Sequence, residues 1–141
     1  MNQALEQLKV PGPIPNRYTQ PFWDGTAKEQ FMLQHCDDCS HWVFYPRSHC
    51  PHCWSRSLSW KEASGLGKVK SFTDIHRPGH PAWEAVTPYT VALIRLDEGP
   101  TMLSTVIDTP RELLTVGQPV KAAYVKVGEF VLPMFRALTR K

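Results

Sequence analysis

The sequence has no apolar run approaching the ~20 residues that a membrane-spanning helix requires. Its first ten residues, MNQALEQLKV, contain an acidic residue and lack the apolar centre of a secretory signal peptide. We therefore expect a cytoplasmic protein without a membrane segment.

Long helices are also unexpected, because the 141-residue chain contains 13 prolines. Hydrophobic residues make up 42% of the sequence, which is enough for a core and argues against global disorder. This length suits one compact domain, or a small domain with an added module.

No pattern typical of a self-contained catalytic site stands out, neither a Ser/His/Asp order nor a paired-carboxylate motif. Asp37 and Asp38 are adjacent, but they fall in a cysteine-rich turn where a solvated role is expected. His76 and His80 flank Arg77 near the end of an expected strand and offer acid–base groups, although exposed loop histidines are the commoner case. A free-standing enzyme is therefore the weakest of three functional interpretations.

All four cysteines lie in one segment, HCDDCSHWVFYPRSHCPHC, residues 35–53. They form two C-x2-C pairs separated by ten residues, Cys36 with Cys39 and Cys50 with Cys53. Each pair predicts a tight knuckle whose sulfurs converge, and two facing knuckles complete the tetrahedron that zinc prefers. Four thiolates leave no open position, so we expect a structural zinc. A rubredoxin-type iron site uses similar ligands and remains an alternative to zinc.

Other uses of these cysteines are less well supported. Structural disulfides are rare in cytosolic chains, and a thioredoxin-like centre needs one C-x-x-C beside a βαβ pattern that this sequence lacks. Four of the six histidines lie in the same segment. Because four thiolates saturate the metal, we do not expect these imidazoles to be ligands. We expect backbone N–H groups of the knuckles to bond the sulfurs, with some imidazoles as additional hydrogen-bond donors around the site.

The charge is too small and too scattered to indicate nucleic-acid binding. The formal net charge of +3 counts the cysteines as neutral, and four thiolates around Zn²⁺ contribute −2, which leaves the metal-bound protein near +1. A nucleic-acid protein usually shows a denser basic stripe.

Two short helices are expected before the cysteines. Residues 2–9 form the first, ahead of the helix-breaking PGPIP. Thr19 caps the second, with Pro21 near its first turn. Its apolar spacing predicts one stripe made of Phe22, Trp23, Ala27 and Phe31. Both helices are too short to be stable alone, so they must pack on this protein or on a partner.

After Trp60 the pattern changes to strands and turns. The expected strands begin near Val69 and continue at residues 89–96, 101–107, 116–127 and 130–138. In the fourth of these, one face carries Val120, Ala122 and Tyr124. About five strands in about eighty residues favour a small antiparallel barrel, for which the five-stranded OB-fold is the commonest solution.

The longest irregular connection is RPGHPAWEAVTPY, residues 77–89, and long loops on small barrels tend to carry function. The sequence thus predicts a mainly β protein in three parts. These are an N-terminal helical arm (1–31), a rubredoxin-like four-cysteine zinc ribbon (32–58) and a C-terminal five-stranded OB-fold barrel (59–141).

This order of parts resembles the thiolase-associated zinc-ribbon/OB-fold family, catalogued as domain of unknown function thirty-five. The matching segments span most of the chain: PFWDG (21–25), the first C-x-x-C, YPR (45–47), CPHC (50–53), SGLGKV (64–69), PY (88–89) and LDEG (96–99). Ser40 and Trp54 depart from the family pattern, because glycine is common after each knuckle. A positive φ there would cost a non-glycine residue ~1 kcal/mol, far less than the ~10 kcal/mol that zinc ligation supplies.

The resemblance implies a function that the spacing of residues does not show. Family members are similar to non-catalytic small subunits of thiolase-superfamily enzymes: acyltransferases, thiolases and retro-aldolases that act on CoA thioesters. The large subunit carries the catalytic group, and the small one buttresses it and helps to form the acyl-CoA channel. We therefore expect a thiolase-like partner in a two-plus-two heterotetramer, with a CoA thioester at the interface.

Two sets of residues are candidates for these contacts. Aromatic anchors are the usual energetic centres of interfaces, and an arginine suits either a partner's anion or the negative charge of the zinc site. The expected partner-binding residues are Phe22, Trp23, Phe31 and Arg47. The expected acyl-CoA channel residues are Arg77, His80, Trp83 and Tyr89.

The alternative interpretation is a single-stranded nucleic-acid-binding protein, because OB-folds stack bases on aromatic residues in a basic groove. Phe72, Tyr89 and Tyr124 would provide the stacking rings. The near-neutral charge of the metal-bound form counts against this interpretation.

Overall fold

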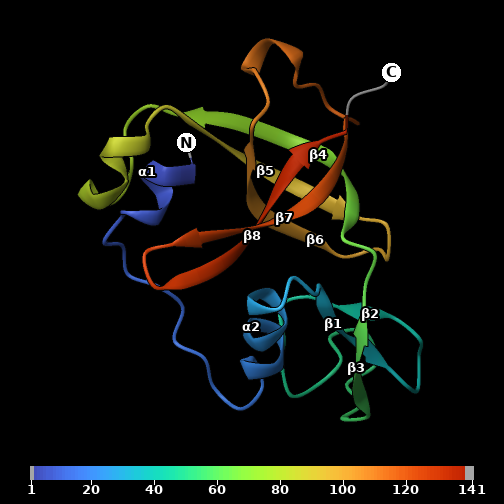
Figure 1. Cartoon of the computed structure of the whole chain (residues 1–141). Coiled ribbons are helices and arrows are strands. Elements are labelled where there is room, and N and C mark those ends of the chain that lie inside the picture. Colours follow the sequence, from blue (N-terminus) through green and yellow to red (C-terminus); the bar gives the residue numbers. More distant parts are fainter. Residues whose placement is uncertain (1, 139–141) are drawn as a thin grey trace.

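The computed structural model describes residues 2–138 and shows a mainly β protein (Figure 1). The helices are α1 (Asn2–Glu6), α2 (Gln20–Ala27) and the 3-10 helices η1 (Pro81–Val86) and η2 (Arg111–Leu113). The strands are β1 (Met32–Cys36), β2 (Trp42–Val43), β3 (Leu58–Glu62), β4 (Leu66–Ile75), β5 (Tyr89–Leu96), β6 (Thr101–Ile107), β7 (Pro119–Val127) and β8 (Phe130–Ala137). The last residues of the expected barrel domain, 139–141, lie outside the described part. None of the helices within residues 2–138 is long and apolar enough to cross a membrane.

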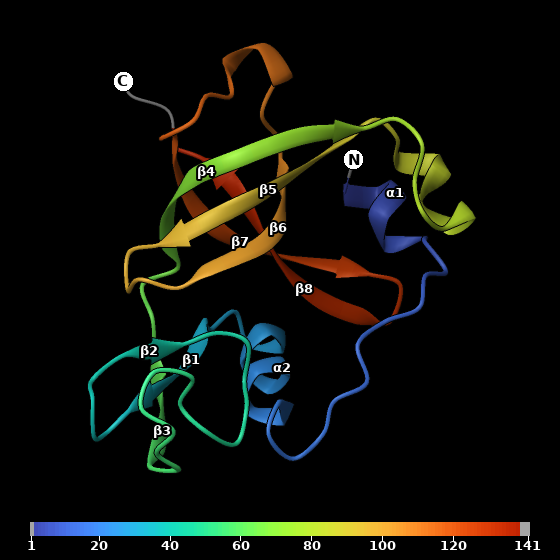
Figure 2. The same cartoon turned by 180° about the vertical axis from the view of Figure 1, so that it is seen from behind.

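The strands form two separate sheets, and Figures 1 and 2 show α2 beside the smaller one. The smaller sheet has the order β2-β1-β3, is antiparallel throughout, and carries the cysteine-bearing turns. The other five strands close into a barrel in the order β4-β5-β6-β8-β7. Because β3 pairs with β1 as far as Glu62, the ribbon sheet continues past residue 58 before the chain enters the barrel.

One pair of barrel strands is parallel. β6 runs parallel to β8, with Val106 opposite Phe135 and Ile107 opposite Arg136. The other neighbouring pairs are antiparallel. An odd number of strands cannot close with every neighbour antiparallel, so the expectation of an antiparallel barrel holds for all pairs but this one.

β7 packs against a core cluster on each face, which lets the barrel and the arm share it. The face predicted from the sequence packs against the main core and carries Val120, Ala122 and Tyr124. The opposite face packs in a second cluster with the arm and carries Ala123, Val125 and Val127. The strand therefore positions the arm as well as closing the barrel.

α2 is shorter than expected and buries a different face. Thr19 occupies the N-cap position, but its hydroxyl accepts the N–H of Asn16 at 2.9 Å and does not cap the helix. Glu29, at φ 58°, ends the helix in the left-handed turn typical of C-termini. The buried helix residues are Phe22, Gly25 and Thr26. The predicted stripe is thus wrong for Ala27, which is exposed, and for Phe31, which lies beyond the helix.

The arm packs on its own chain. Leu5 and Leu8 are 1% and 6% exposed, and α1 lies against η1 and β7 (Figure 2). Phe22 and Phe31 are 1% and 2% exposed, and Phe31 belongs to the main core of the barrel. We expected some apolar residues of the arm to remain exposed, and Ile14, which is 93% exposed, is one of them.

Candidate metal centre and interaction surfaces

The four cysteine sulfurs meet at one point of the ribbon, where all four Sγ atoms lie within 4.8 Å of one another. The Sγ atoms of Cys36 and Cys53 are 3.5 Å apart, as are those of Cys39 and Cys50. A tetrahedron of sulfurs ~2.3 Å from a central zinc has edges of about 3.8 Å, whereas a disulfide bond is about 2.05 Å long. The arrangement fits a four-coordinate structural zinc held by these cysteines, and not two disulfides.

The two knuckles have matching backbone structures. The N–H of Ser40 donates to the carbonyl of Cys36, and the N–H of Trp54 donates to the carbonyl of Cys50, both at 2.9 Å. Ser40 and Trp54 have φ angles of 65° and 64°, a left-handed conformation that glycine adopts most readily. The unusual backbone angle considered for these two positions is therefore present at both.

The surroundings of the sulfurs shift their pKa values in opposite directions. At Cys39 the backbone N–H of His41 lowers the pKa, but desolvation and the neighbouring thiols outweigh it and raise the pKa to about 12. At Cys50 desolvation raises the pKa, but the N–H groups of Cys53 and His52 outweigh it and lower the pKa to about 7. Four thiolates this close repel one another, and a bound divalent cation would remove that repulsion. The donor set therefore matches a zinc ion.

Two histidines flank the metal centre. The Nδ1 atom of His41 lies 3.3 Å from Sγ of Cys39, and the N–H of His52 donates to Sγ of Cys50 at 3.4 Å. The two imidazole rings stack with their centroids 4.0 Å apart. The backbone N–H of His52 and the imidazole of His41 are thus neighbours of the sulfurs, in line with the expected backbone and imidazole contacts.

Arg47 is held in place by Gln34, a residue that the sequence analysis missed. The Gln34 side-chain amide, in a residue only 5% exposed, donates to the carbonyl of Arg47 and accepts its N–H, both at 2.9 Å. The Arg47 guanidinium donates to the carbonyls of Tyr45 and Phe44 at 2.9 and 3.2 Å. The guanidinium therefore stabilises the ribbon loop that contains Phe44 and Tyr45. The available signal was a polar residue in the middle of the apolar run FMLQHC, residues 31–36.

Phe22 joins the arm to the ribbon. Its ring packs edge-on against Trp23 and Tyr45, with centroids 4.9 and 6.0 Å apart. The indole N–H of Trp23 donates to the Tyr45 hydroxyl at 3.0 Å, and both residues keep exposed surface. Among the expected partner-binding residues, Phe22 and Phe31 thus lie inside this chain, whereas Trp23 and Arg47 remain accessible.

The 77–89 segment folds against the arm instead of forming an open loop. Nδ1 of His80 accepts the N–H of Ala82 at 3.1 Å and so caps η1. The rings of Trp83 and Tyr89 lie 5.6 Å apart and pack on the second core cluster, whereas the Arg77 side chain is exposed. His80 also lines a cavity of about 610 Å³ between the arm and the β7–β8 turn.

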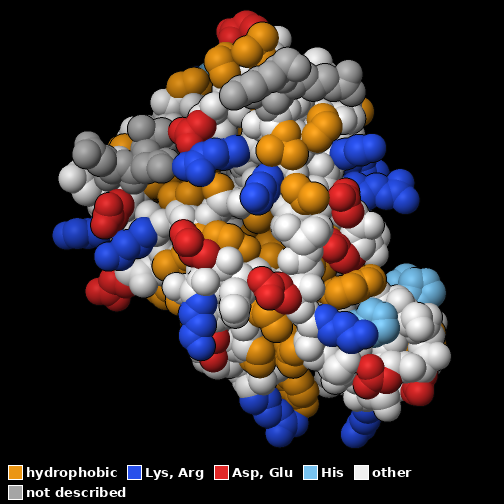
Figure 3. Space-filling model, turned by 45° about the vertical axis from the view of Figure 1, so that its right-hand side comes forward, with side chains coloured by type: hydrophobic (Ala, Val, Ile, Leu, Met, Phe, Trp, Pro, Cys, Tyr) orange, Lys and Arg blue, Asp and Glu red, His pale blue; other side chains and the backbone are white. Residues whose placement is uncertain are grey.

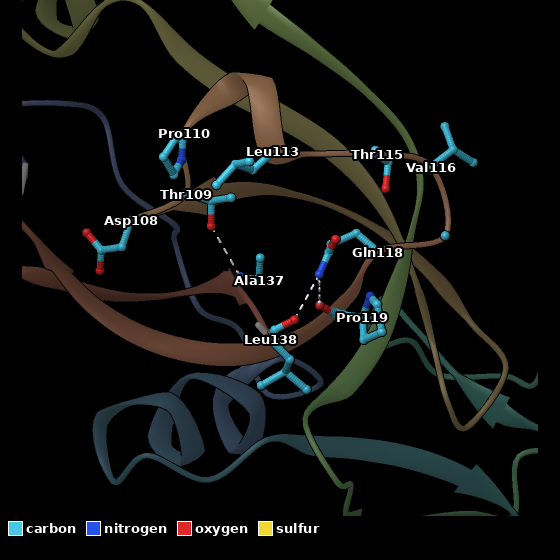
Figure 4. A pocket seen from close by; sticks show the side chains of 11 residues that line it. Asp108, Thr109, Pro110, Leu113, Thr115, Val116, Gln118, Pro119, Ala137 and Leu138 are labelled. Atoms are coloured by element: carbon cyan, nitrogen blue, oxygen red, sulfur yellow. Dashed lines mark hydrogen bonds between the residues drawn. The ribbon is translucent and has the colours of Figure 1, made fainter. Parts of the chain in front are cut away.

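A second cavity, of about 530 Å³, lies between the 108–118 connection and the end of β8 (Figure 4). The Gln118 side chain in its wall donates to the carbonyl of Leu138 at 2.9 Å. Asp108 is paired with Arg136, with 2.6 Å between Oδ2 and Nε. Since Asp108 is the one carboxylate among the described lining residues, this cavity does not assemble a pair of acid–base groups from them.

The residues considered for acid–base catalysis lie in two different parts of the molecule. Asp37 and Asp38 accept hydrogen bonds from serine hydroxyls of the 55–59 segment, the turn role expected for them. His76 and His80 are exposed on the connection between β4 and β5. The structure therefore does not bring the two pairs together.

The aromatic residues considered for base stacking do not form one exposed platform. They are half-buried and pack on two different core clusters: Phe72 and Tyr124 on the first, Tyr89 on the second. On the face shown in Figure 3, acidic and basic side chains are interspersed. Neither feature matches the basic, aromatic groove that single strands need.

α1 occupies the side of the barrel where OB-folds commonly bind oligonucleotides, between the first and the last hairpin connections. Here these connections are the 76–88 and 128–129 segments, and α1 packs against η1 in the first of them. At the second, the backbone of the arm lies so close to Gly128 that an added Cβ atom would be only 2.7 Å from the carbonyl oxygen of Leu8. The arm would have to leave before a nucleic acid could use this surface.

Known families match both parts of the molecule. The zinc-ribbon part, residues 23–59, matches the family described as "ChsH2, rubredoxin-like zinc ribbon domain", and residues 60–125 match "ChsH2, C-terminal OB-fold domain". A DUF35 domain-containing scaffold protein of Methanocaldococcus jannaschii is 30% identical over 106 residues, which are 72% of this chain and 74% of that protein. This chain belongs to the DUF35 family. Its two β units are the zinc ribbon and the OB-fold that the sequence predicted.

Longer relatives contain a similar segment. A probable enoyl-CoA hydratase alpha subunit of Thermomonospora curvata is 35% identical over 128 residues, covering 89% of this chain and 39% of that protein. The 3-oxo-4,17-pregnadiene-20-carboxyl-CoA hydratase alpha subunit of Mycobacterium tuberculosis is 30% identical over 123 residues, covering 85% and 38%. This DUF35 chain thus spans about two-fifths of the length of these curated relatives.

Two solved structures share the fold of this DUF35 chain. A chain described as "Ltp2-ChsH2(DUF35) aldolase" matches with a TM-score of 0.78 at 31% identity, over 89% of this chain and 98% of that one. A DUF35 protein of Sulfolobus solfataricus matches with a TM-score of 0.61 at 19% identity, over 84% of each chain, which shows the fold alone.

Proposed function

We propose that this DUF35 chain is a non-catalytic accessory subunit of a thiolase-superfamily enzyme, which buttresses a larger catalytic subunit and helps to form its acyl-CoA channel. The observation that carries the proposal is the match, at 31% identity, over 98% of a chain from the structure described as "Ltp2-ChsH2(DUF35) aldolase". That description pairs the domain with a second component, and the names of both hydratase relatives include CoA. In this proposal the partner carries out the acyl-group chemistry.

The surface around Trp23 is the proposed contact with the large subunit. Phe22 and Phe31 support it from inside, because they bind the arm to the ribbon and to the barrel core. The hydrogen bond from Trp23 to Tyr45 restrains the indole before any partner arrives. A restrained aromatic side chain loses little conformational entropy on binding, which favours its use as an anchor. Arg47 lies on the adjoining ribbon loop and completes this proposed surface.

The 77–89 segment is the proposed wall of the acyl-CoA channel. Trp83 and Tyr89 provide packed aromatic rings, and the exposed Arg77 and His80 provide polar groups on the same connection. An arginine is well suited to the phosphates of CoA, because its planar fork of donors matches phosphate oxygens. The CoA thioester would then lie between this connection and the large subunit.

The first test is reconstitution. The full chain is co-expressed with a candidate large subunit of the thiolase superfamily, and the purified product is examined by size-exclusion chromatography with light scattering and by acyl-CoA turnover. We expect a stable two-plus-two complex whose turnover needs both chains. Equal turnover by the large subunit alone, or no association, would contradict the accessory role.

The second test separates the two surfaces. Trp23→Ala should weaken assembly about tenfold or more, as truncation of an aromatic anchor does, whereas Leu113→Ala changes another exposed apolar residue, 64% exposed, and should not. Arg77→Ala should raise KM for the acyl-CoA with little change in kcat, since it removes a binding contact. Arg95→Ala, an exposed arginine of β5, is the matched control.

A further inference from the structure

A groove of about 280 Å³ lies on the ribbon at the second knuckle. Its lining residues include no acidic side chain, and they are Arg47, Ser48, His49, Cys50, Pro51 and Trp54. The ion pairs formed within residues 2–138 do not include Arg47. The groove therefore presents a cationic side chain that is not paired with a carboxylate of the described chain.

A row of side chains fixes the direction of the hydrogen bonds at this groove. Nε of Arg56 lies 3.0 Å from Nε2 of His49, and because the Nε–H of an arginine can only donate, the imidazole accepts there. The imidazole is therefore neutral and carries its proton on Nδ1, which lies 2.7 Å from Oγ of Ser48 and donates to it. Both ring nitrogens are then occupied, and the hydroxyl proton of Ser48 is left for another acceptor.

The Arg47 guanidinium also has donors left for a partner. It donates to the carbonyls of Tyr45 and Phe44, and Gln34 holds its backbone in place. A guanidinium carries more N–H groups than these two bonds use. Arg47 and Ser48 thus both offer hydrogen-bond donors at the groove, and the arginine adds a positive charge.

Donors of this kind suit an anion. A carboxylate accepts charge-assisted hydrogen bonds from a guanidinium and a short hydrogen bond from a hydroxyl. Trp54, which is 77% exposed, forms another part of the groove wall, and its ring centroid lies 6.2 Å from that of His49. An indole beside an ion pair excludes water, which strengthens the pair.

The groove continues the surface that we propose for the large subunit. Nε of Arg47 donates to the carbonyl of Tyr45, whose hydroxyl accepts the indole N–H of Trp23. The exposed residues along this path are Trp23, Tyr45, Arg47 and Trp54. Tryptophan, tyrosine and arginine are the residue types enriched at the energetic centres of protein interfaces. This composition favours a protein partner over a free small anion.

We propose that the groove receives an aspartate or glutamate side chain of the large subunit, bound by the Arg47 guanidinium and the Ser48 hydroxyl beside the Trp54 indole. This inference rests on the proposed function, because it takes that subunit as the partner and names the chemistry of one contact. It gives the exposed Arg47 and Trp54 a common role on the proposed surface.

The charge of the ribbon determines how this contact acts. In the 36–60 segment two acidic and two basic residues balance, so a zinc tetrathiolate leaves the ribbon near −2. Such a surface does not attract a distant anion, and recognition depends on hydrogen bonds made at contact. Loss of the contact should therefore raise the dissociation rate and leave the association rate nearly unchanged.

The test measures binding of zinc-loaded variants of the full chain to the purified large subunit by biolayer interferometry, with a thermal melt of each variant alone. Ser48→Ala should raise the dissociation constant about tenfold, through the dissociation rate, and leave the melting temperature unchanged. Ser48→Asp places the chain's own carboxylate in the groove and should abolish binding. Ser57→Ala removes an exposed hydroxyl of the same ribbon outside the groove and should bind like the parent.

Two replacements of Arg47 separate its charge from its structural contacts. Arg47→Lys and Arg47→Gln both lose the guanidinium that donates to two carbonyls, so their melting temperatures should fall alike. Arg47→Lys keeps the positive charge and should bind about fivefold more tightly than Arg47→Gln. Equal binding of the two variants would overturn the carboxylate contact.

Inorganic phosphate and CoA, each titrated onto the chain alone, are the remaining probes. Binding of either that Ser48→Asp abolishes would assign the groove to a small anion and overturn the contact with the large subunit. Large-subunit binding that is unchanged by Ser48→Ala and Ser48→Asp overturns the contact and leaves the proposed function intact. A Ser48→Ala chain that melts earlier and binds less would assign Ser48 a structural role and also overturn the contact. Failure of the parent to bind the large subunit overturns both the contact and the proposed function.

Discussion

The side-chain amide of Gln34 and the backbone of Arg47 form two reciprocal hydrogen bonds of 2.9 Å each. Gln34 thereby gives the ribbon loop the pair of bonds that a neighbouring strand would give. It lies on β1 between Leu33 and His35, opposite Val43 on one side and Trp60 on the other. The side chain thus ties the 44–49 loop to the central strand of the ribbon.

Replacing Gln34 by Ala should lower the free energy of unfolding of the ribbon by about 2–3 kcal/mol, because two hydrogen bonds of a buried side chain are lost and the N–H and carbonyl groups of Arg47 lose their partners. The measurement is urea unfolding with zinc in excess. Gln20→Ala is the control, since Gln20 is exposed and its side-chain amide donates to Asp24 on the surface of α2, so its effect should be within about 0.5 kcal/mol. Equal effects of the two substitutions would contradict the role of Gln34.

Arg47→Ala should destabilise the ribbon by about 0.5–1.5 kcal/mol, because the guanidinium donates to two carbonyls but is itself exposed. Arg56→Ala is the matched control on the same ribbon. Thermal melting reports the loss, and binding to the large subunit reports any contact with a partner. Unchanged melting and unchanged assembly would leave Arg47 as a solvated surface residue.

Metal analysis should give one zinc per chain, held by the four cysteines whose sulfurs converge. Cys39→Ala, or removal of zinc by a chelator, should unfold the ribbon and leave most of the barrel signal in circular dichroism, because the barrel has its own core. Affinity for zinc should fall as the pH falls, since protons compete for the thiolates. Less than half an equivalent of zinc in freshly purified, folded protein would contradict this, unless iron made up the difference.

Leu5→Ala should destabilise the docked arm by about 2–4 kcal/mol, because Leu5 is 1% exposed in the cluster beneath α1. The measurement is limited proteolysis, and we expect faster cleavage at residues 9–18 while the ribbon and the barrel stay intact. Glu6→Ala, which removes only an exposed pair with Lys126, should not change the rate. Equal proteolysis of the two variants would show that α1 is not held by this cluster.

Shortened chains should behave differently according to where they begin. A chain beginning at Asn16 keeps α2 and should retain the ribbon and most of the barrel. A chain beginning at Met32 loses Phe22 and Phe31, which are both almost fully buried, and should unfold or aggregate by itself. Two-dimensional NMR of both chains is the measurement. A well-folded chain from Met32 would contradict this account of the core.

Local chemistry made part of the molecule predictable from the sequence. The C-x2-C spacing defines the metal centre because each knuckle closes within a few residues. The barrel strands were predictable because alternating β-branched runs and turn residues act over short distances. Even the left-handed angles at Ser40 and Trp54 followed from their position after each knuckle, which is a local requirement.

Long-range packing decided the rest. Nothing near Phe31 indicates that it leaves the helix and fills the barrel core, because its partners, such as Phe135, are distant in sequence. The same holds for Gln34, whose polar side chain is buried because the loop that it binds returns there. The sequence by itself determined the two short N-terminal helices, the barrel strands and the residues that meet at the metal, but not the 3-10 helices η1 and η2. Only the tertiary structure decided which aromatic residues are buried within the chain and which, like Trp23 and Trp54, keep exposed surface. The reason is that burial depends on the residues, distant in sequence, that each side chain contacts in the fold.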